Sequence, residues 1–550
     1  MNKFWLESYP PDVPAEIDPG QYRSLVHLLE NAFTEFSQRT AYVCKDDSLT
    51  YQQIDLWSRD LAAWLQARAL KKGARVAVML PNLLQFPIAT AAILRAGCIV
   101  VNINPLYTPR ELEHQLNDCG AEVIIVLSHY APTLEQVAAR TALRHVVFIG
   151  LQERIGIDAA EAEIAAPSPL HATSFNRALS EGAGLTMQEV ELAHEDVAFL
   201  QYTGGTTGVS KGAMLTHRNM LAAVLQSEAW LLPAFERAPR IDSPVFVCAL
   251  PLYHIFALTG CCLLSTKIGG TNILITNPRD MPAFVAELAR HKFNVLPGVN
   301  TMYNGLMNTP SFAELDFSSL RLCNAGGTAV QLAIAQRWHK MTGTLIVEGY
   351  GLSETSPGAT ANPVDTMEFS GTIGLPIPST EIAILDDQGL PVPVGQAGEI
   401  AIRGPQLMAG YWGRPDETEK AMTADGFFKS GDIGIIDARG YVRIIDRKKD
   451  MILVSGFNVY PNEIEGVVAT LPGVLECACV GVADEVSGEA VKLFVVRRDP
   501  ALSAQQIREY CREQLTAYKN PKHIAFLDEL PKTPVGKILR RELRDKKEPA

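Results

Sequence analysis

The sequence has 550 residues, of which 47% are apolar, so it can build one very large core or several ordinary ones, and a disordered or fibrous protein is excluded. Its 49 lysines and arginines against 61 aspartates and glutamates give a net charge of −12, which argues against nucleic acid as a partner. The ten cysteines contain no CxxC pair. This argues against a zinc site or a disulfide framework and favours a reduced, cytosolic compartment.

The N-terminal segment, MNKFWLESYPPDVPAE, lacks the apolar core of a secretory signal and soon becomes acidic and rich in proline, so we expect a cytoplasmic protein. The stretch from Val245 to Leu264 is apolar enough to suggest a membrane span. Pro251, His254 and Gly260 interrupt it, and no basic flank orients it. A buried strand, loop and helix of a soluble fold is therefore the better interpretation.

Short apolar runs alternate with helical patterns from residue 74 onward. The patterns predict strands at 75–80, 98–103, 122–127 and 146–149, with a helix at 85–96. A further helix is predicted after Thr108, because Thr108, Pro109 and Glu111 form a capping box with proline at the first helical position, and Gly120 ends the segment. Strands that are apolar on both faces and alternate with helices predict a parallel sheet covered on two sides.

The composition changes again at two places. Residues 151–187 are rich in alanine, glutamate and serine without periodicity, which indicates a surface connection. Residues 441–446 alternate like a strand, and the chain then mixes short strands such as 492–496 with amphipathic helices such as 504–515. We therefore predict an α/β protein in which residues 1–446 form a large N-terminal domain of parallel sheets covered by helices. Residues 447–550 form a small α+β C-terminal domain, with a boundary at 446–450.

The most distinctive segment, Tyr202 to Gly212, follows an apolar strand at 197–200. Its last ten residues, 203–212, include four glycines, three threonines and Lys211. Glycines let backbone amides turn toward an anion, threonines add hydroxyl donors and the lysine adds positive charge, so the segment predicts a polyphosphate-binding loop. A Gly/Thr hairpin without a ligand is the alternative. The segment is not a Walker A loop, because no Gly-Lys-Ser/Thr ends it.

This segment resembles the phosphate-binding signature of the adenylate-forming (AMP-binding) enzymes, which include acyl-CoA synthetases, 4-coumarate-CoA ligases, luciferases and adenylation domains. Five further motifs of that superfamily follow in the expected order, so the resemblance covers essentially the whole chain: Pro251 to His254, Gly349 to Glu354, Lys429 to Asp432, Asp446 to Asp450, and Pro534 to Lys537. Segments 102–116 and 446–465 most resemble the bacterial long-chain fatty-acid-CoA ligases.

The resemblance implies a role for each matching residue. The residues expected to contact ATP or AMP lie in several loops: Thr203, Gly204, Gly205, Thr206, Thr207, Gly208, Lys211, Gly326, Gly327, Tyr350, Ser353, Asp432 and Arg447. Among these, Asp432 would bind the ribose hydroxyls and Tyr350 would lie against adenine. An ordinary turn around Asp432 and a surface charge at Arg447 are the alternatives.

The remaining implied roles concern catalysis and movement. The catalytic residues would be Lys537, Glu354 and His254, with Glu354 also holding Mg²⁺ and Lys537 contacting the carboxylate and the α-phosphate. An ordinary turn around Glu354 and a core histidine at His254 are the alternatives. Phe256 would gate the acyl site, whose walls we expect at 299–306 and 326–330. Gly456 would lie beside the CoA pantetheine channel, and Lys449 would be the hinge of a mobile C-terminal domain.

Some positions depart from the family pattern. Gly204 and Ser210 stand where many members have serine and proline, and Ser353 and Ser430 stand where threonine is common. Each keeps a small or hydroxyl-bearing side chain, so we expect activity to survive. Arg540 and Arg541 follow Lys537 in a basic segment, and a solvated helix face is the ordinary interpretation of both.

The resemblance implies a two-step ligase that uses ATP, CoA, a fatty acid and Mg²⁺. The fatty-acid carboxylate would attack the α-phosphate of ATP to give acyl-AMP and pyrophosphate, and the CoA thiol would then displace AMP. The alternatives are a medium-chain or aryl-CoA ligase, a P-loop kinase or ATPase, and a fatty-acid carrier or uptake protein. We also expect a homodimer and peripheral association with the inner face of the membrane, although 151–187 has no basic amphipathic stretch.

Overall fold

The helix predicted after Thr108 is present as α4 (Pro109–Cys119). The Thr108 backbone N–H donates to the Glu111 carboxylate at 2.8 Å, and the Glu111 N–H donates to the Thr108 hydroxyl at 3.4 Å. Gly120 adopts a φ of 61°, the left-handed conformation that closes many helices. Local sequence signals therefore set both ends of this helix.

The computed structural model describes residues 3–150, 154–156, 170–203, 210–455, 457–484, 487–533 and 536–545. A seven-stranded sheet has the order β7-β6-β5-β3-β4-β8-β9, and all neighbours are parallel except β8 and β9. Its strands are β3 (Arg75–Met79), β4 (Ile99–Asn102), β5 (Val123–Leu127), β6 (His145–Ile149), β7 (His171–Ser174), β8 (Val197–Thr203) and β9 (Lys211–Thr216). The predicted parallel strands are confirmed.

Helices cover both faces of this sheet. Val123 and Ile125 pack in one cluster with α2 (Tyr51–Gln66), α3 (Gln85–Arg95) and α6 (Phe175–Ala183), whereas Ile124 and Val126 pack in another with α4 and α5 (Ala131–Glu135). Successive side chains of a strand point to opposite faces, so both faces of β5 are buried. This explains why the predicted strands are apolar throughout.

A second sheet of the order β10-β11-β1-β2 lies beside α1 (Leu25–Glu35) and α7 (His217–Glu236). Its strands are β1 (Thr40–Cys44), β2 (Asp47–Thr50), β10 (Val245–Cys248) and β11 (Thr271–Leu274). After β10 the chain forms a loop, α8 (Ile255–Ala257), a π-helical segment (Leu258–Leu263) and α9 (Leu264–Lys267). The interpretation of the stretch after Val245 as strand, loop and helix is confirmed. None of the helices that the structure describes has the length and apolarity to cross a bilayer.

Two four-stranded sheets follow in the chain. One is β12 (Cys323–Ala325), β13 (Ile346–Tyr350), β14 (Thr360–Ala361) and β15 (Leu375–Pro376). The other is the antiparallel sheet β16 (Glu381–Leu385), β17 (Gly398–Arg403), β18 (Phe428–Ile436) and β19 (Val442–Arg447). Only the last strand of this antiparallel sheet was predicted from the sequence. The helices of this part are α10 (Met281–Leu288), α11 (Asn300–Met307), α12 (Leu332–Thr342) and α13 (Pro415–Ala421).

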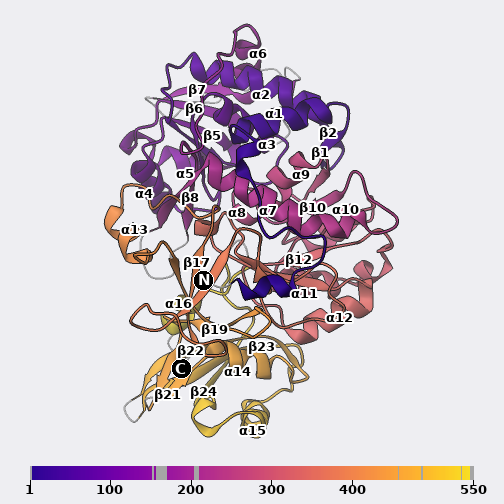
Figure 1. The fold of residues 1–550 in the computed structure, drawn as a ribbon, viewed down its shortest axis with the longest axis vertical. Helices are drawn as coiled ribbons and strands as arrows, with labels where there is room; N and C mark the ends of the chain where they lie inside the picture. The colour runs from indigo at the N-terminus through magenta and orange to yellow at the C-terminus, as the bar shows by residue number, and fades with distance from the viewer. Residues whose placement is uncertain are drawn as a thin grey trace.

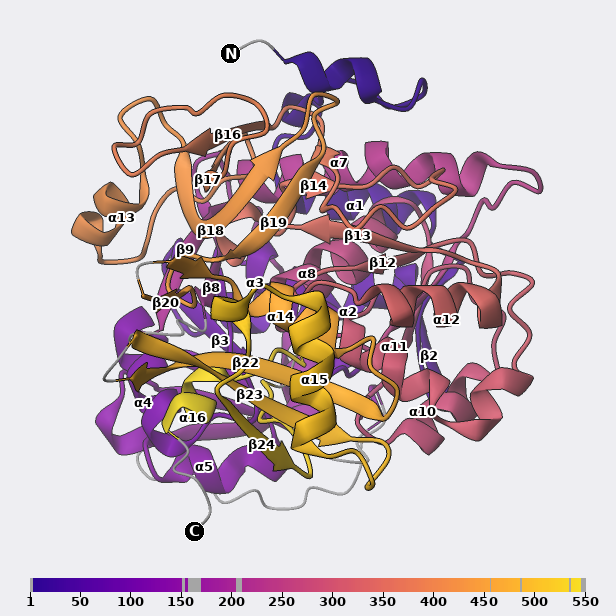
Figure 2. The ribbon, with the colours of Figure 1, turned by 90° about the horizontal axis from the view of Figure 1, so that it is seen from below.

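The C-terminal elements form a lobe at one end of the molecule (Figure 1). The sheet is β20 (Ile452–Val454), β21 (Phe457–Val459), β22 (Val474–Asp484), β23 (Gly488–Arg497) and β24 (His523–Leu527), and the helices are α14 (Pro461–Val468), α15 (Ala504–Gln514) and α16 (Arg540–Asp545). Figure 2 shows this lobe from below, lying across the larger part. Cys477 and Cys479 are buried in β22, as expected.

Candidate active site

Three polar side chains from β13, β18 and β19 are joined to one another. The Tyr350 hydroxyl donates to Asp432 Oδ2 at 2.6 Å, and Arg447 Nε lies 3.1 Å from Asp432 Oδ1. Asp432 and Arg447 are register partners across β18 and β19. The Asp432 side chain is only 4% exposed. A carboxylate has about four acceptor positions, so Asp432 keeps the capacity to accept further hydroxyl groups.

Ser430 supports this arrangement through its hydroxyl group. It donates to the Ile400 carbonyl at 2.7 Å and accepts the Asp432 backbone N–H at 3.1 Å. These two hydrogen bonds tie the turn before Asp432 to the neighbouring strand β17. A hydroxyl is the group these contacts require, and serine supplies it as threonine would.

Lys537 reaches the same region from the C-terminal lobe. A Cβ added at Gly327 would lie 3.2 Å from Lys537 Cε and 3.9 Å from Nζ, and one added at Gly536 would lie 2.6 Å from Thr301 Oγ1. Burial and the charge of Arg447 lower the pKa of Lys537 to about 8, although the charges of Asp432 and Glu354 act in the opposite direction. Lys537 is therefore a partly buried amine close to the carboxylates of the predicted site.

Glu354 is buried and held by Tyr411. The Tyr411 hydroxyl donates to Glu354 Oε1 at 2.7 Å, and the Met408 N–H donates to the Glu354 carbonyl at 2.9 Å. Burial raises the pKa of Glu354, whereas the Tyr411 hydroxyl and the charges of Arg447 and Lys537 lower it. Carboxylate oxygens are hard ligands, so this side chain is chemically suited to a magnesium ion.

His254 lies at the start of α8. Its Nδ1 accepts the Phe256 N–H at 3.4 Å, which caps the helix. Burial and the charge of Lys537 lower the pKa of His254 to about 3, so the imidazole is neutral at pH 7. Phe256 Cε1 would lie 3.2 Å from a Cβ at Gly326, so the ring limits the side chain that position 326 can carry. The two residues of the predicted acyl motif thus face the Gly326–Gly327 loop and Lys537.

The predicted phosphate loop lies between β8 and β9. Thr203 ends β8 and Lys211 begins β9, and the two are register partners. Ser210 closes the base of the hairpin, because its hydroxyl donates to the Thr203 carbonyl at 2.6 Å. Five of the predicted contacts, together with Gly456 of the expected CoA channel, lie outside the described residues: Gly204, Gly205, Thr206, Thr207 and Gly208.

Lys211 has two partners that were not predicted from the sequence. It forms an ion pair with Glu417 of α13, and its Nζ lies 5.1 Å from the centre of the Tyr411 ring. Both partners come from the segment after β17, about 200 residues further along the chain. In the sequence, Tyr411 is marked only by the glycine before it, and Glu417 only by its place in an acidic first helical turn. Neither signal shows that the residue contacts Lys211.

The other predicted residues surround this centre. Gly326 and Gly327 follow β12, and Gly327 has a φ of +80°, which favours glycine. Ser353 opens the short 3₁₀ turn Ser353–Thr355 that carries Glu354. Lys449 is exposed, two residues beyond the end of β19. The structure therefore brings together Lys537, Glu354, Asp432 and Arg447 with the loop at Gly327, whereas Lys449 lies at the edge.

The structure corrects one surface assignment. Arg540, interpreted as a solvated residue, has a side chain that is only 18% exposed. Its Nη2 lies 2.9 Å from both oxygens of Glu465 and donates to Asn462 Oδ1 at 2.9 Å, and its Nη1 lies 3.5 Å from Asp450. Arg541, by contrast, is exposed as expected. The helical period that makes Arg541 a surface residue turns Arg540 inward.

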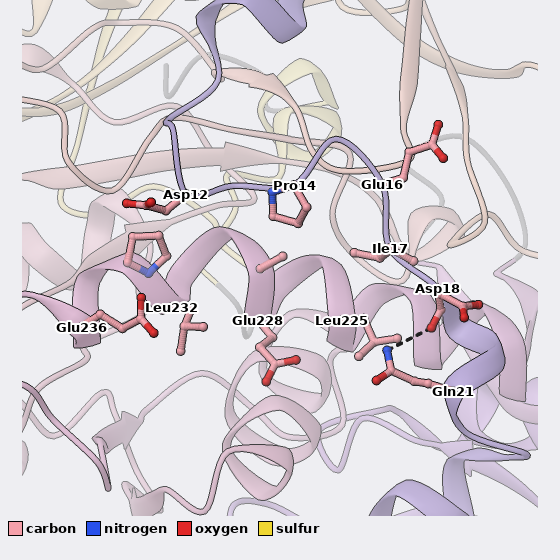
Figure 3. Close-up of a pocket in the computed structure, with 12 residues that line it drawn as sticks. Asp12, Pro14, Glu16, Ile17, Asp18, Gln21, Leu225, Glu228, Leu232 and Glu236 are labelled. Carbon is pink, nitrogen blue, oxygen red and sulfur yellow. Dashed lines mark hydrogen bonds between the residues drawn. The ribbon is translucent and has the colours of Figure 1, made fainter.

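A separate groove lies between the N-terminal segment and α7 (Figure 3). It has a volume of about 350 Å³ and is lined by apolar side chains and several carboxylates. Figure 3 shows Asp12 and Glu16 on the N-terminal side and Glu228 and Glu236 on the helix. None of the predicted site residues lines this groove.

The chain matches two family models. Residues 29–412 match the AMP-binding enzyme model, and residues 463–537 match the AMP-binding enzyme C-terminal domain model. A long-chain-fatty-acid–CoA ligase of Escherichia coli O6:H1 is 52% identical, covering 99% of this chain and 98% of its own. A feruloyl-CoA synthase of an Amycolatopsis species is 34% identical, covering 90% and 94%.

Solved structures share the fold. The crystal structure of the anthranilate CoA ligase AuaEII in complex with anthranoyl-AMP has a TM-score of 0.85 against this chain. The two are 26% identical, and the match covers 96% of this chain and 98% of that one. The AMP-binding model matches first along the chain and the C-terminal domain model second, which is the order that the motifs predicted. The chain therefore belongs to the AMP-binding enzyme family.

Proposed function

We propose that the protein is an AMP-forming long-chain fatty-acid–CoA ligase. In the first step, a fatty-acid carboxylate attacks the α-phosphate of ATP, forming a carboxylate–phosphate bond and releasing pyrophosphate. In the second step, the CoA thiol attacks the acyl carbon and AMP leaves. The observation that carries the proposal is the position of the partly buried Lys537, which reaches from the C-terminal lobe to the carboxylates of Glu354 and Asp432 in the larger part.

The residues of the site have complementary tasks in the first step. Asp432 accepts the ribose hydroxyls, and Lys211 and Arg447 offset phosphate charge. The Lys537 ammonium contacts the negative charge that gathers between carboxylate and α-phosphate in the transition state. His254 is neutral at pH 7, so it adds no cation to the apolar side where the acyl chain enters. Phe256 gates that entrance, beside the Gly326–Gly327 loop.

The first step is also proposed to use Mg²⁺. The buried carboxylate of Glu354 fits a hard divalent cation because its donor atoms are oxygens, and Arg447 and Lys537 are the cations near it. Glu354 would hold the ion, which when bound would neutralise charge on the triphosphate. Tyr411 keeps the Glu354 carboxylate in place.

The second step requires Lys537 to leave the site. We assign residues 1–446 to an N-terminal domain and 447–550 to a mobile C-terminal domain that turns about Lys449. Two features support a pivot there. Lys449 is exposed, and Asp446 and Asp450 on either side are bound to C-terminal residues, since Asp446 Oδ2 accepts the Asn462 N–H at 2.9 Å and Asp450 pairs with Arg544 at 2.8 Å. Gly456 would then line the CoA channel. Cytoplasmic location, peripheral membrane association and a homodimer stay predictions.

The test is the release of AMP and pyrophosphate with CoA and saturated acids from about C4 to C18, together with aromatic acids. We expect AMP rather than ADP, and the highest kcat/KM with the long chains. A preference for C6 to C10 or for aryl acids would contradict the substrate class. Release of ADP would contradict adenylation, and ATP-independent lipid binding without any AMP would favour a carrier.

A further inference from the structure

The segment from Met408 to Trp412 connects two parts of the site that are far apart in the sequence. On one side its backbone pairs with β9, since the Met214 N–H donates to the Gly410 carbonyl at 2.9 Å and the Trp412 N–H donates to the Gly212 carbonyl at 2.8 Å. On the other side the Met408 N–H donates to the Glu354 carbonyl at 2.9 Å. The segment therefore lies between β9 and Glu354.

Tyr411 is the side chain at the centre of this segment. It is 8% exposed, and its own N–H donates to Thr418 Oγ1 at 2.9 Å, which fixes its backbone. Its hydroxyl holds Glu354 Oε1 at 2.7 Å, and its ring faces Lys211 Nζ at 5.1 Å from the centroid. One rigid side chain thus contacts both a carboxylate suited to a metal and the cation of the phosphate loop.

We propose that Tyr411 is a positioning residue that orients Glu354 toward the magnesium ion of the ATP complex and sets its separation from Lys211. A hydrogen bond to Oε1 fixes the plane of the carboxylate and leaves its remaining acceptor positions for a cation. Without that bond the carboxylate can rotate, and part of its binding to the cation is lost. This inference rests on the proposed function, because it assumes that Glu354 acts on magnesium-bound ATP.

The test compares Tyr411→Phe with the unmodified enzyme. Phenylalanine keeps the ring under Lys211 and removes only the hydroxyl. Calorimetric titration with ATP alone and with ATP plus MgCl₂, without fatty acid, measures the gain in ATP affinity that magnesium provides. We expect this gain to fall about tenfold in Tyr411→Phe, the effect of losing a hydrogen bond to a charged group, while the affinity for ATP alone is unchanged.

Two half-reaction assays complete the test. Pyrophosphate release should need about tenfold more free Mg²⁺ to reach half its maximum rate in Tyr411→Phe. Thioester formation from prepared acyl-AMP and CoA should keep its rate. The matched control is Tyr51→Phe, which also removes a buried tyrosine hydroxyl, one that donates to the Gly270 carbonyl at 2.7 Å, and should match the unmodified enzyme in all three assays.

Three results would overturn the proposal: an unchanged magnesium gain in Tyr411→Phe, an equal loss in both half-reactions, or no magnesium gain in the unmodified enzyme. A different result would refute the proposed function instead. In that case the unmodified enzyme would form no acyl-AMP from ATP and any fatty acid.

Discussion

Lys537 is a partly buried amine whose neighbours act on its charge in both directions. Burial and Arg447 disfavour the ammonium form, and Asp432 and Glu354 favour it. A bound triphosphate adds negative charge, which favours the ammonium form further. The surroundings of this one residue therefore connect the binding of ATP to the protonation state that its proposed role in the first step requires.

Replacing Lys537 with alanine should separate the two half-reactions. We expect acyl-AMP formation to fall at least about 100-fold, because a preorganised charge at the transition state is lost, while thioester formation from prepared acyl-AMP survives. Pyrophosphate release and thioester formation measure the two steps. The control is Lys519→Ala, which removes a lysine that pairs with Glu463 in the same lobe. An equal loss of both steps in Lys537→Ala would rule out the assigned role.

The first step should also depend on pH through Lys537. Its pKa of about 8 in the free enzyme means that the ammonium loses its proton as the pH rises through 8. We expect kcat/KM for ATP in pyrophosphate release to fall above that pH with the slope of one proton, since this constant reports groups of the free enzyme. Lys537→Arg keeps its charge at high pH, so any residual activity should lack the fall. The same fall in Lys537→Arg would assign it to another group.

At the scale of elements, the β8–β9 hairpin carries the predicted phosphate loop on a firm base. Thr203 and Lys211 are register partners, and the Ser210 hydroxyl bridges back to the Thr203 carbonyl. α13 supplies Glu417 to the lysine at the start of β9. Two antiparallel strands and one helix thereby determine where the ends of the loop lie.

Ser210→Ala should loosen the base of this hairpin. It removes one partly buried hydrogen bond, so we expect the KM for ATP to rise about three- to tenfold while the melting temperature changes little. Steady-state pyrophosphate release and thermal unfolding measure these effects. Ser243→Ala loses a similar hydroxyl contact, to the Gly269 carbonyl at 3.0 Å, and should leave the KM unchanged. An unchanged KM in Ser210→Ala would show that the bridge does not shape the loop.

At the scale of the whole molecule, a buried ionic network holds together the lobe that carries Lys537. Arg540 of α16 lies between Glu465 of α14 and Asp450 of the segment before β20. Leu543 of α16 is fully buried against Ala478 and Val480 of β22. Because Arg540 follows Lys537 by three residues, the network anchors the chain directly after Lys537.

Arg540→Met should destabilise this lobe. It removes the arginine that pairs with the buried carboxylate of Glu465 and leaves Asp450 paired with Arg544, and an unpaired buried carboxylate costs about 3 to 5 kcal/mol. We expect faster proteolytic cleavage after residue 450 and a lower first unfolding transition. Arg541→Met makes the same change at the adjacent exposed position and should cost less than about 0.5 kcal/mol. Equal effects of the two changes would mean that the network adds no stability.

Much of the fold was predictable because its signals are local. The capping box at Thr108 and the fully apolar run of β5 identify their elements within a few residues. The antiparallel sheet of β16 to β19 was largely missed. Its strand β18 is only partly buried, and Ser430-Gly431-Asp432 interrupts its apolar pattern with polar and turn residues of the candidate site.

The sequence by itself determined the family, the order of the motifs and the residue types of the site, because glycine loops, caps and charged motifs keep their chemistry wherever the chain folds. Only the tertiary structure decided which groups meet. Lys211 and Glu417 are 206 residues apart, and Tyr411 and Glu354 are 57 apart. Such contacts depend on how whole sheets and lobes pack together, and the inward turn of Arg540 depends on that packing too.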